Sequence, residues 1–140
     1  MASVKSMMTS IQVFSDDTNL DAYDGKTLWT RSPEQTYQVW QLELVGETPA
    51  GTGIYTIEST HYKGQCLEAT TRGGPVTMKP RTPDKLSQRW VVDTGEEQTT
   101  IESVKFRALV LTANGEDTPV ILKESTPDAP NQAWTLFTKM

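Results

Sequence analysis

A ten-residue motif that ends on tryptophan occurs three times in this chain and constrains its fold more than any other feature. The motif reads Arg or Ser, Ser or Thr, Pro, Asp or Glu, three variable residues, Gln, one variable residue, and Trp. Its tryptophans are Trp40, Trp90 and Trp134, which lie 50 and 44 residues apart. Because a motif that recurs at a nearly fixed spacing marks a repeated structural unit, the sequence predicts one unit built three times.

The residue types within the motif predict its local structure. Ser or Thr followed by Pro and an acid favours a short helical turn, since the hydroxyl can cap a free backbone N–H and the carboxylate sits at the positive helix end. A glutamine and a tryptophan two residues apart then share one face of a strand. The tryptophans would fill the core, and each glutamine, whose amide needs partners when buried, would tie the incoming loop to it. These structural residues are Gln38, Trp40, Gln88, Trp90, Gln132 and Trp134.

Length and charge limit the number of domains and the classes of partner. The 140 residues, 36% of them hydrophobic, suit a single domain over residues 1–140. With 13 basic and 18 acidic residues, the chain carries a formal net charge of −5. Nucleic acids and anionic membranes favour basic patches, so we expect neither as a partner. We also expect no insertion into a membrane, because no apolar stretch is long enough to span one.

Cysteine usage predicts the compartment. Cys66 is the one cysteine, so the chain can form no internal disulfide. Its place in the apolar run Gln65-Cys66-Leu67 is typical of a small core residue rather than a nucleophile. Residues 1–14 lack the apolar run of a secretory signal. We therefore expect a protein that is cytoplasmic or released without a signal peptide.

Short alternating segments bounded by turn residues fill each repeat, and none has the period of a helix. They predict an all-β domain of twelve short strands, four in each of three repeats. The repeats would span approximately residues 10–47, 51–95 and 98–140.

Distances counted back from the tryptophans test this alignment. Leu67 and Leu111 each lie 23 residues before their tryptophan, so the second and third repeats are in register. Leu20 lies only 20 residues before Trp40. We assign this difference to a shorter hairpin in the first repeat, turning at Asp24-Gly25, a dipeptide that suits tight hairpins.

Threefold Gln-x-Trp at this spacing resembles the ricin-B-type β-trefoil, and the resemblance covers nearly the whole chain. Small single-domain trefoils without disulfides are similar to the fungal members of that family. Those include lectins and the mycocypin-like and cocaprin-like protease inhibitors. The resemblance implies a β-trefoil scaffold, and a scaffold does not fix a function.

In sugar-binding members of that family, a repeat supplies an Asp after the Leu of its second strand, an aromatic ring near its third strand and an Asn before Gln-x-Trp. Carboxylate and amide groups hold sugar hydroxyls while a ring stacks on the apolar sugar face. The first repeat offers Asp21 and, one place off the usual register, Trp29, with Tyr37 where Asn is expected. The third repeat keeps Asn131 alone. If the protein is a lectin, these four residues are its candidate sugar ligands.

The sequence contains no constellation that indicates catalysis. His61 is the one histidine and lies in a predicted loop, without an identifiable nucleophile or metal partner. We therefore expect neither catalytic residues nor a bound metal or cofactor.

Two hairpins are candidates for contact with a protein partner, because a stiff barrel can present narrow loops at a low entropic cost. Their residues are Tyr23, Asp24, Gly25 and Lys26 in the first repeat and Thr71, Arg72, Gly73 and Gly74 in the second. Asp-Gly and Gly-Gly are also simply good turns.

The resemblance, together with the broken sugar triads, favours a non-catalytic inhibitor of papain-like cysteine or aspartic proteases that occludes the active-site cleft with these loops. The alternative is a ricin-B-type lectin with a non-standard sugar site in the first repeat. The partners would then be proteases or glycans, and self-association into a homodimer is compatible with either.

Overall fold

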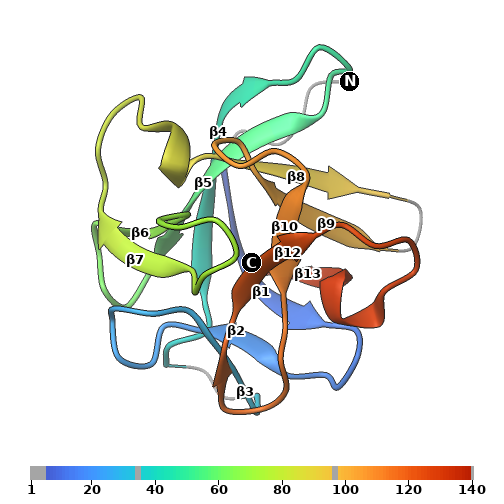
Figure 1. Ribbon diagram of the computed structural model, residues 1–140. Coiled ribbons are helices and arrows are strands. Elements are labelled where there is room, and N and C mark those ends of the chain that lie inside the picture. The colour runs from blue at the N-terminus through green and yellow to red at the C-terminus, as the bar shows by residue number, and fades with distance from the viewer. Residues whose placement is uncertain (1–5, 34–35, 96–97, 140) are drawn as a thin grey trace.

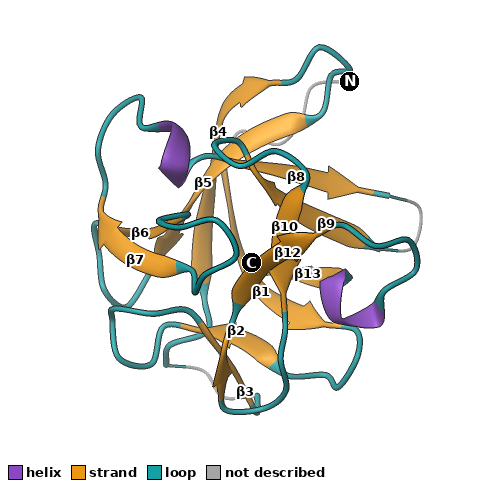
Figure 2. Cartoon of the chain, viewed as in Figure 1, coloured by secondary structure: helices purple, strands orange, loops and turns teal. Residues whose placement is uncertain are grey.

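The computed structural model describes residues 6–33, 36–95 and 98–139. Within these ranges the chain forms thirteen strands and two 3-10 helices (Figures 1 and 2). Their bounds are β1 Ser6–Val13, β2 Asn19–Asp21, β3 Trp29–Arg31, β4 Trp40–Glu47, β5 Gly53–Ser59, β6 Gln65–Glu68, β7 Thr77–Pro80, η1 Leu86–Gln88, β8 Trp90–Thr94, β9 Thr99–Ser103, β10 Leu109–Thr112, β11 Thr118–Pro119, β12 Ile121–Glu124, η2 Pro130–Gln132 and β13 Trp134–Thr138.

Six strands close into a barrel. The antiparallel pairs run β1 to β4, β4 to β5, β5 to β8, β8 to β9, β9 to β13, and β13 back to β1. Hairpins β2–β3, β6–β7 and β10–β12 supply the remaining strands, one hairpin for each repeat. This is the predicted all-β trefoil. The described residues give thirteen strands rather than twelve because the third repeat has one more two-residue strand, β11, paired with β3.

A ring of backbone hydrogen bonds joins the three hairpins. The N–H of Leu28 donates to the carbonyl of Val76 at 2.9 Å, Val76 donates to Val120 at 3.0 Å, and Val120 donates back to Leu28 at 2.9 Å. All three side chains are fully buried. Each hairpin therefore depends on the other two, because opening one would leave buried backbone groups of its neighbours without partners.

The three motif tryptophans occupy equivalent places in the core, as the repeat predicted. Each is buried, and each indole N–H donates to a backbone carbonyl of its own repeat. The acceptors are Leu20 at 3.1 Å, Leu67 at 3.2 Å and Leu111 at 3.2 Å. Burial of one indole stabilises the fold by about 5 kcal/mol before the cost of ordering the chain.

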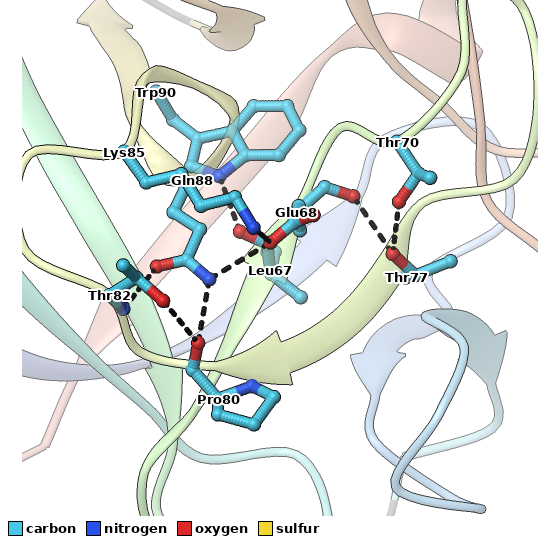
Figure 3. A network of polar contacts seen from close by, with 9 residues as sticks. All are labelled: Leu67, Glu68, Thr70, Thr77, Pro80, Thr82, Lys85, Gln88 and Trp90. Carbon is cyan, nitrogen blue, oxygen red and sulfur yellow. Dashed lines mark hydrogen bonds and ion pairs between the residues drawn. The ribbon is translucent and has the colours of Figure 1, made fainter.

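The glutamines tie the incoming loops to the core, also as predicted. In the second repeat Gln88 donates to Glu68 and to the Pro80 carbonyl, and it accepts the backbone N–H of Thr82, each at 2.9 Å (Figure 3). Gln132 makes the same three kinds of contact in the third repeat, with Thr112 in place of the acid. The side chain of each glutamine therefore links a strand, the end of a hairpin and the turn that follows it.

The helical turns differ from the prediction. They begin after the Pro-acid step rather than at it, and the residues before them, Lys85 and Ala129, form no side-chain cap. Instead the acids Asp84 and Asp128 have φ values of 58° and 59°, so Pro-Asp makes a left-handed turn. The capping role assigned to the Ser or Thr is therefore wrong for these two repeats. Residues 34–35 of the first motif lie outside the described residues.

The first repeat differs from the prediction in two respects. It already includes Ser6, before the expected start near residue 10, because Ser6 to Thr9 pair with β4. The distance from Leu20 to Trp40 is three residues shorter than in the other repeats, and the hairpin accounts for only part of this difference. Asp21 pairs with Trp29, eight residues on, where the other hairpins pair residues nine apart, so the connection before Trp40 accounts for the other two residues.

Candidate functional site

Five aromatic side chains from different parts of the chain meet on the surface beside the first hairpin. Tyr23 lies in the β2–β3 loop, Trp29 begins β3, Tyr37 precedes β4, and His61 and Tyr62 follow β5. We call these five residues the aromatic cluster. The chain has four tyrosines, four tryptophans and one histidine. Apart from Tyr55 and the three motif tryptophans, which are core residues, all of them lie in this cluster.

The rings contact one another edge to face and face to face. Tyr23 meets Trp29 and Tyr37 edge on, with ring centres 6.3 and 6.4 Å apart. Tyr37 stacks on Tyr62 at 6.0 Å, and the His61 ring lies 4.7 Å from both. Pairs of this geometry each contribute about 0.5–1.5 kcal/mol beyond the area that they bury. The cluster is therefore a pre-formed surface rather than a set of independent side chains.

Local hydrogen bonds hold the two loops of the cluster together. The Tyr62 hydroxyl donates to the backbone carbonyl of Tyr23 at 3.1 Å. Ser59 Oγ accepts the backbone N–H groups of His61 and Tyr62, which fixes the turn that carries them. Gly25 has a φ of 70°, and a Cβ there would lie 3.1 Å from the Tyr62 ring. A glycine is thus needed both for the turn and for the close approach of the ring.

Asp24 fixes the hairpin turn electrostatically. Its carboxylate accepts the N–H groups of Lys26 at 2.9 Å and Thr27 at 3.0 Å. Partial desolvation raises the pKa of Asp24, but these two bonds outweigh it and the net shift is downward. The Trp29 indole N–H contributes to the same lowering, although it makes no full hydrogen bond there. Of the predicted dipeptide, Gly25 alone takes a positive φ, so the Asp24 side chain provides the rest of the turn.

The five residues of the cluster differ in their exposure to solvent. Tyr23 is 49% exposed and His61 is exposed, whereas Trp29, Tyr37 and Tyr62 are half-buried. A cation borders the surface, since the guanidinium carbon of Arg31 lies 4.0 Å from the centre of the Tyr23 ring.

Arg31 connects the cluster to another repeat. Its Nε is 3.2 Å from Asp117, which belongs to the third repeat. Residues of all three repeats therefore contribute to this one surface.

Two predicted sugar ligands, Trp29 and Tyr37, lie in the cluster, and a third, Asp21, lies beneath it. Asp21 is fully buried and accepts the amide of Gln38 at 2.9 Å. Glu68 and Thr112 occupy its place in the other repeats and accept from their glutamines in the same way. Asp21 therefore has the same structural role as Glu68 and Thr112, which is to accept the amide of the motif glutamine. Its direct contact with a sugar stays a prediction, and the burial counts against it.

Asn131 is not brought to the cluster. Asn131 is the third-repeat equivalent of Tyr37. The backbone N–H of Ala113 donates to the Asn131 carbonyl, and in the first repeat the N–H of Ala22 donates to the Tyr37 carbonyl. Its side-chain amide donates to the Ala113 carbonyl at 3.2 Å. Asn131 lines a separate pocket in the third repeat.

The two predicted protein-binding hairpins are both packed against other repeats. Residues 23–26 lie against Tyr62, as described above. Residues 71–74 lie against β12, where the Leu122 N–H donates to the Gly74 carbonyl at 3.2 Å. Their role as protease-binding loops stays a prediction.

The thiol of Cys66 is placed where it cannot react readily. Cys66 is fully buried, and burial together with the nearby Glu58 carboxylate raises the pKa of its thiol to about 11. This confirms Cys66 as a small buried residue.

Among the described residues, no group of three or more His, Cys, Asp or Glu side chains could hold a metal ion. Within the same residues, no helix has the length and apolar character needed to cross a membrane.

The family follows from a comparison with known domains. The model of the ricin-type β-trefoil lectin domain matches residues 9–134. The chain belongs to this family. A search among curated proteins gave no match.

Solved structures of lectins share the fold of this ricin-type domain. The Rhizoctonia solani agglutinin has a TM-score of 0.76 and 19% identity over 99% of each chain. The C-half of the earthworm R-type lectin in complex with GalNAc scores 0.68 at 16% identity, covering 95% of this chain and 99% of that one. The Polyporus squamosus lectin bound to the epitope Neu5Aca2-6Galb1-4GlcNAc scores 0.75 at 19% identity, covering 96% and 50%.

Membership of a lectin-domain family indicates a binding protein rather than an enzyme. It favours the lectin alternative over the protease-inhibitor hypothesis, which none of the comparisons supports. Sequence reasoning had found Trp29 and Tyr37 but assigned no role to Tyr62 and His61. The signal that could have found them is the small number of aromatic residues left after the core is filled.

Proposed function

We propose that this ricin-type domain binds carbohydrate at the aromatic cluster beside the first hairpin. The observation that carries the proposal is the gathering of Tyr23, Trp29, Tyr37, His61 and Tyr62 on one partly exposed surface. Membership of a lectin-domain family supports it.

The chemistry of the cluster suits a sugar. A pyranose presents an apolar C–H face that stacks on an aromatic ring, and hydroxyl groups that need polar partners at its edge. Ring surface of Tyr23 and Trp29 supplies the first kind of contact. The His61 ring nitrogens, the tyrosine hydroxyls and the Arg31 guanidinium supply the second. Because the rings already support one another, binding would cost little side-chain ordering.

A glycan array followed by titration of the best ligand tests the proposal. The three motif tryptophans are buried and Trp29 is half-exposed, so a change of tryptophan emission on binding would report on Trp29. We expect Trp29→Ala and Tyr23→Ala each to weaken binding roughly tenfold, which corresponds to about 1.4 kcal/mol for a lost stacking contact. Phe137→Ala is the matched control, because Phe137 is 48% exposed and lies on β13, outside the cluster.

Three outcomes would contradict the proposal. In the first, no glycan of the array binds, and in the second, binding survives both cluster variants unchanged. In the third outcome, the protein inhibits papain or pepsin and the inhibition is lost in Gly25→Ala, which would restore the protease hypothesis.

A further inference from the structure

A pocket of about 680 Å³ lies at the boundary between the second and third repeats. The second-repeat hairpin forms one wall through Arg72 and Gly73, and β10, β12 and η2 form the others. A bridge between Pro75 and Ile121 fixes the hairpin to β12. The two walls are therefore held at a defined separation by backbone contacts.

Aliphatic side chains supply the apolar part of this pocket. The partly exposed ones are Ile121 and Ala129, whereas Leu109 and Leu122, which also border the pocket, are buried in the core; no aromatic ring stands among the described residues that line it. Strand pairing shows why. Thr112 pairs with Ile121 as Asp21 pairs with Trp29, so an isoleucine holds the place of the indole. The pocket offers apolar contact without the ring stacking that the aromatic cluster provides.

Two cations, Arg72 and Lys123, line the same pocket and have no acid partner. Both are exposed, and neither forms an ion pair with any residue in the described ranges. One acid, Glu124, also lines the pocket. The lining is therefore net positive on a chain whose formal net charge is −5.

We propose that this pocket binds a small organic anion with an apolar body, such as an aliphatic or aromatic carboxylate or sulfonate. The apolar body rests on Ile121 and Ala129, and Arg72 and Lys123 hold the anionic group. Charge complementarity decides the ligand class, since two unpaired cations beside an apolar wall favour an acid over a neutral ligand. The inference does not depend on sugar binding at the aromatic cluster.

The dye 8-anilino-1-naphthalenesulfonate combines an anionic group with an apolar body and serves as the probe. We expect saturable binding of one dye per chain, with an affinity that falls as salt is raised. Arg72→Gln and Lys123→Gln should each weaken it at least about fivefold, and the double variant should weaken it further. Lys105→Gln is the matched control, because Lys105 is exposed and lies outside the pocket.

A second measurement keeps the test independent of folding defects. Amide chemical shifts of the isotope-labelled chain should change on dye addition around Arg72, Ile121 and Lys123, and the thermal unfolding of the variants should match that of the unchanged chain. Absence of binding, equal affinity in the double variant, or shifts confined to exposed rings such as Phe14 would each overturn the inference. Trp29→Ala should leave dye binding unchanged, which separates this proposal from the proposed sugar site.

Discussion

Replacement of Gln88 by leucine should destabilise the fold strongly, although no catalytic or binding role is involved. Gln88 is 1% exposed and makes three hydrogen bonds, to Glu68, to the Pro80 carbonyl and from the Thr82 N–H. Leucine is similar in size but can make none of them. The change therefore leaves three polar groups without this partner, and one of them, the carboxylate of the buried Glu68, has little access to water.

The size of the effect follows from the partners. A neutral hydrogen bond contributes about 0.5–1.5 kcal/mol, and one to a charged group contributes about 1.5–3 kcal/mol. Gln88→Leu should then lower the free energy of unfolding by about 4 kcal/mol. Gln132 makes three bonds in the equivalent place, but its side-chain partner is the hydroxyl of Thr112. Gln132→Leu should therefore cost about 1 kcal/mol less than Gln88→Leu.

Urea unfolding followed by tryptophan fluorescence measures both variants, and thermal unfolding should show a Tm lower by roughly 10 °C or more for Gln88→Leu. Gln98→Leu is the control, because Gln98 is exposed and its side chain forms no hydrogen bond with the described residues. A loss below about 1 kcal/mol for Gln88→Leu would refute the assigned role of the glutamine. If Gln132→Leu lowered the free energy of unfolding more than Gln88→Leu, the argument that the charged partner Glu68 makes the larger contribution would be refuted.

Three further predictions concern a thiol, a turn and an acid. Cys66, buried and with its pKa raised to about 11, should react with a disulfide reagent at pH 8 only after urea unfolds the chain; rapid reaction in buffer would contradict its burial. Gly25→Ala should lower stability by about 1–2 kcal/mol, measured in urea, because its φ of 70° is strained for alanine and the Cβ would press on Tyr62. Burial raises the pKa of Glu102, but its bonds with Arg107 and the Ala108 N–H lower it below 4.5. The stability gap between the unchanged chain and Glu102→Gln should be full above pH 4.5 and close as the pH falls through the lowered value; a gap independent of pH would contradict this.

The repeated motif predicted the architecture well because its consequences are local and then multiplied. A tryptophan at a fixed distance from a strand, three times over, leaves few ways to fill one core. The indole contacts of Trp40, Trp90 and Trp134 match this expectation closely. The environment of Cys66 was also predictable, since an apolar neighbourhood in sequence indicated burial in space.

Predictions that relied on a single local rule were less accurate. Thr82 and Thr126 carry a favourable capping pattern, yet their hydroxyls donate to the carbonyls of Pro80 and Glu124 and cap no helix, while their backbone N–H groups donate to the motif glutamines. There a tertiary contact outweighed a local preference. The sugar-ligand prediction for Asp21 stays untested, although its full burial counts against it.

By itself, the sequence determined the threefold all-β barrel, its indole core and the family, because these follow from periodicity and from residue types that bury well. The tertiary structure alone decided where the surface chemistry gathers. Tyr23 and Tyr62 are 39 residues apart, and nothing in their neighbourhood in the chain indicates that one donates a hydrogen bond to the other. Closure of the barrel brings these two residues together. The candidate sugar site and the charged pocket therefore became visible only once the three repeats were placed side by side.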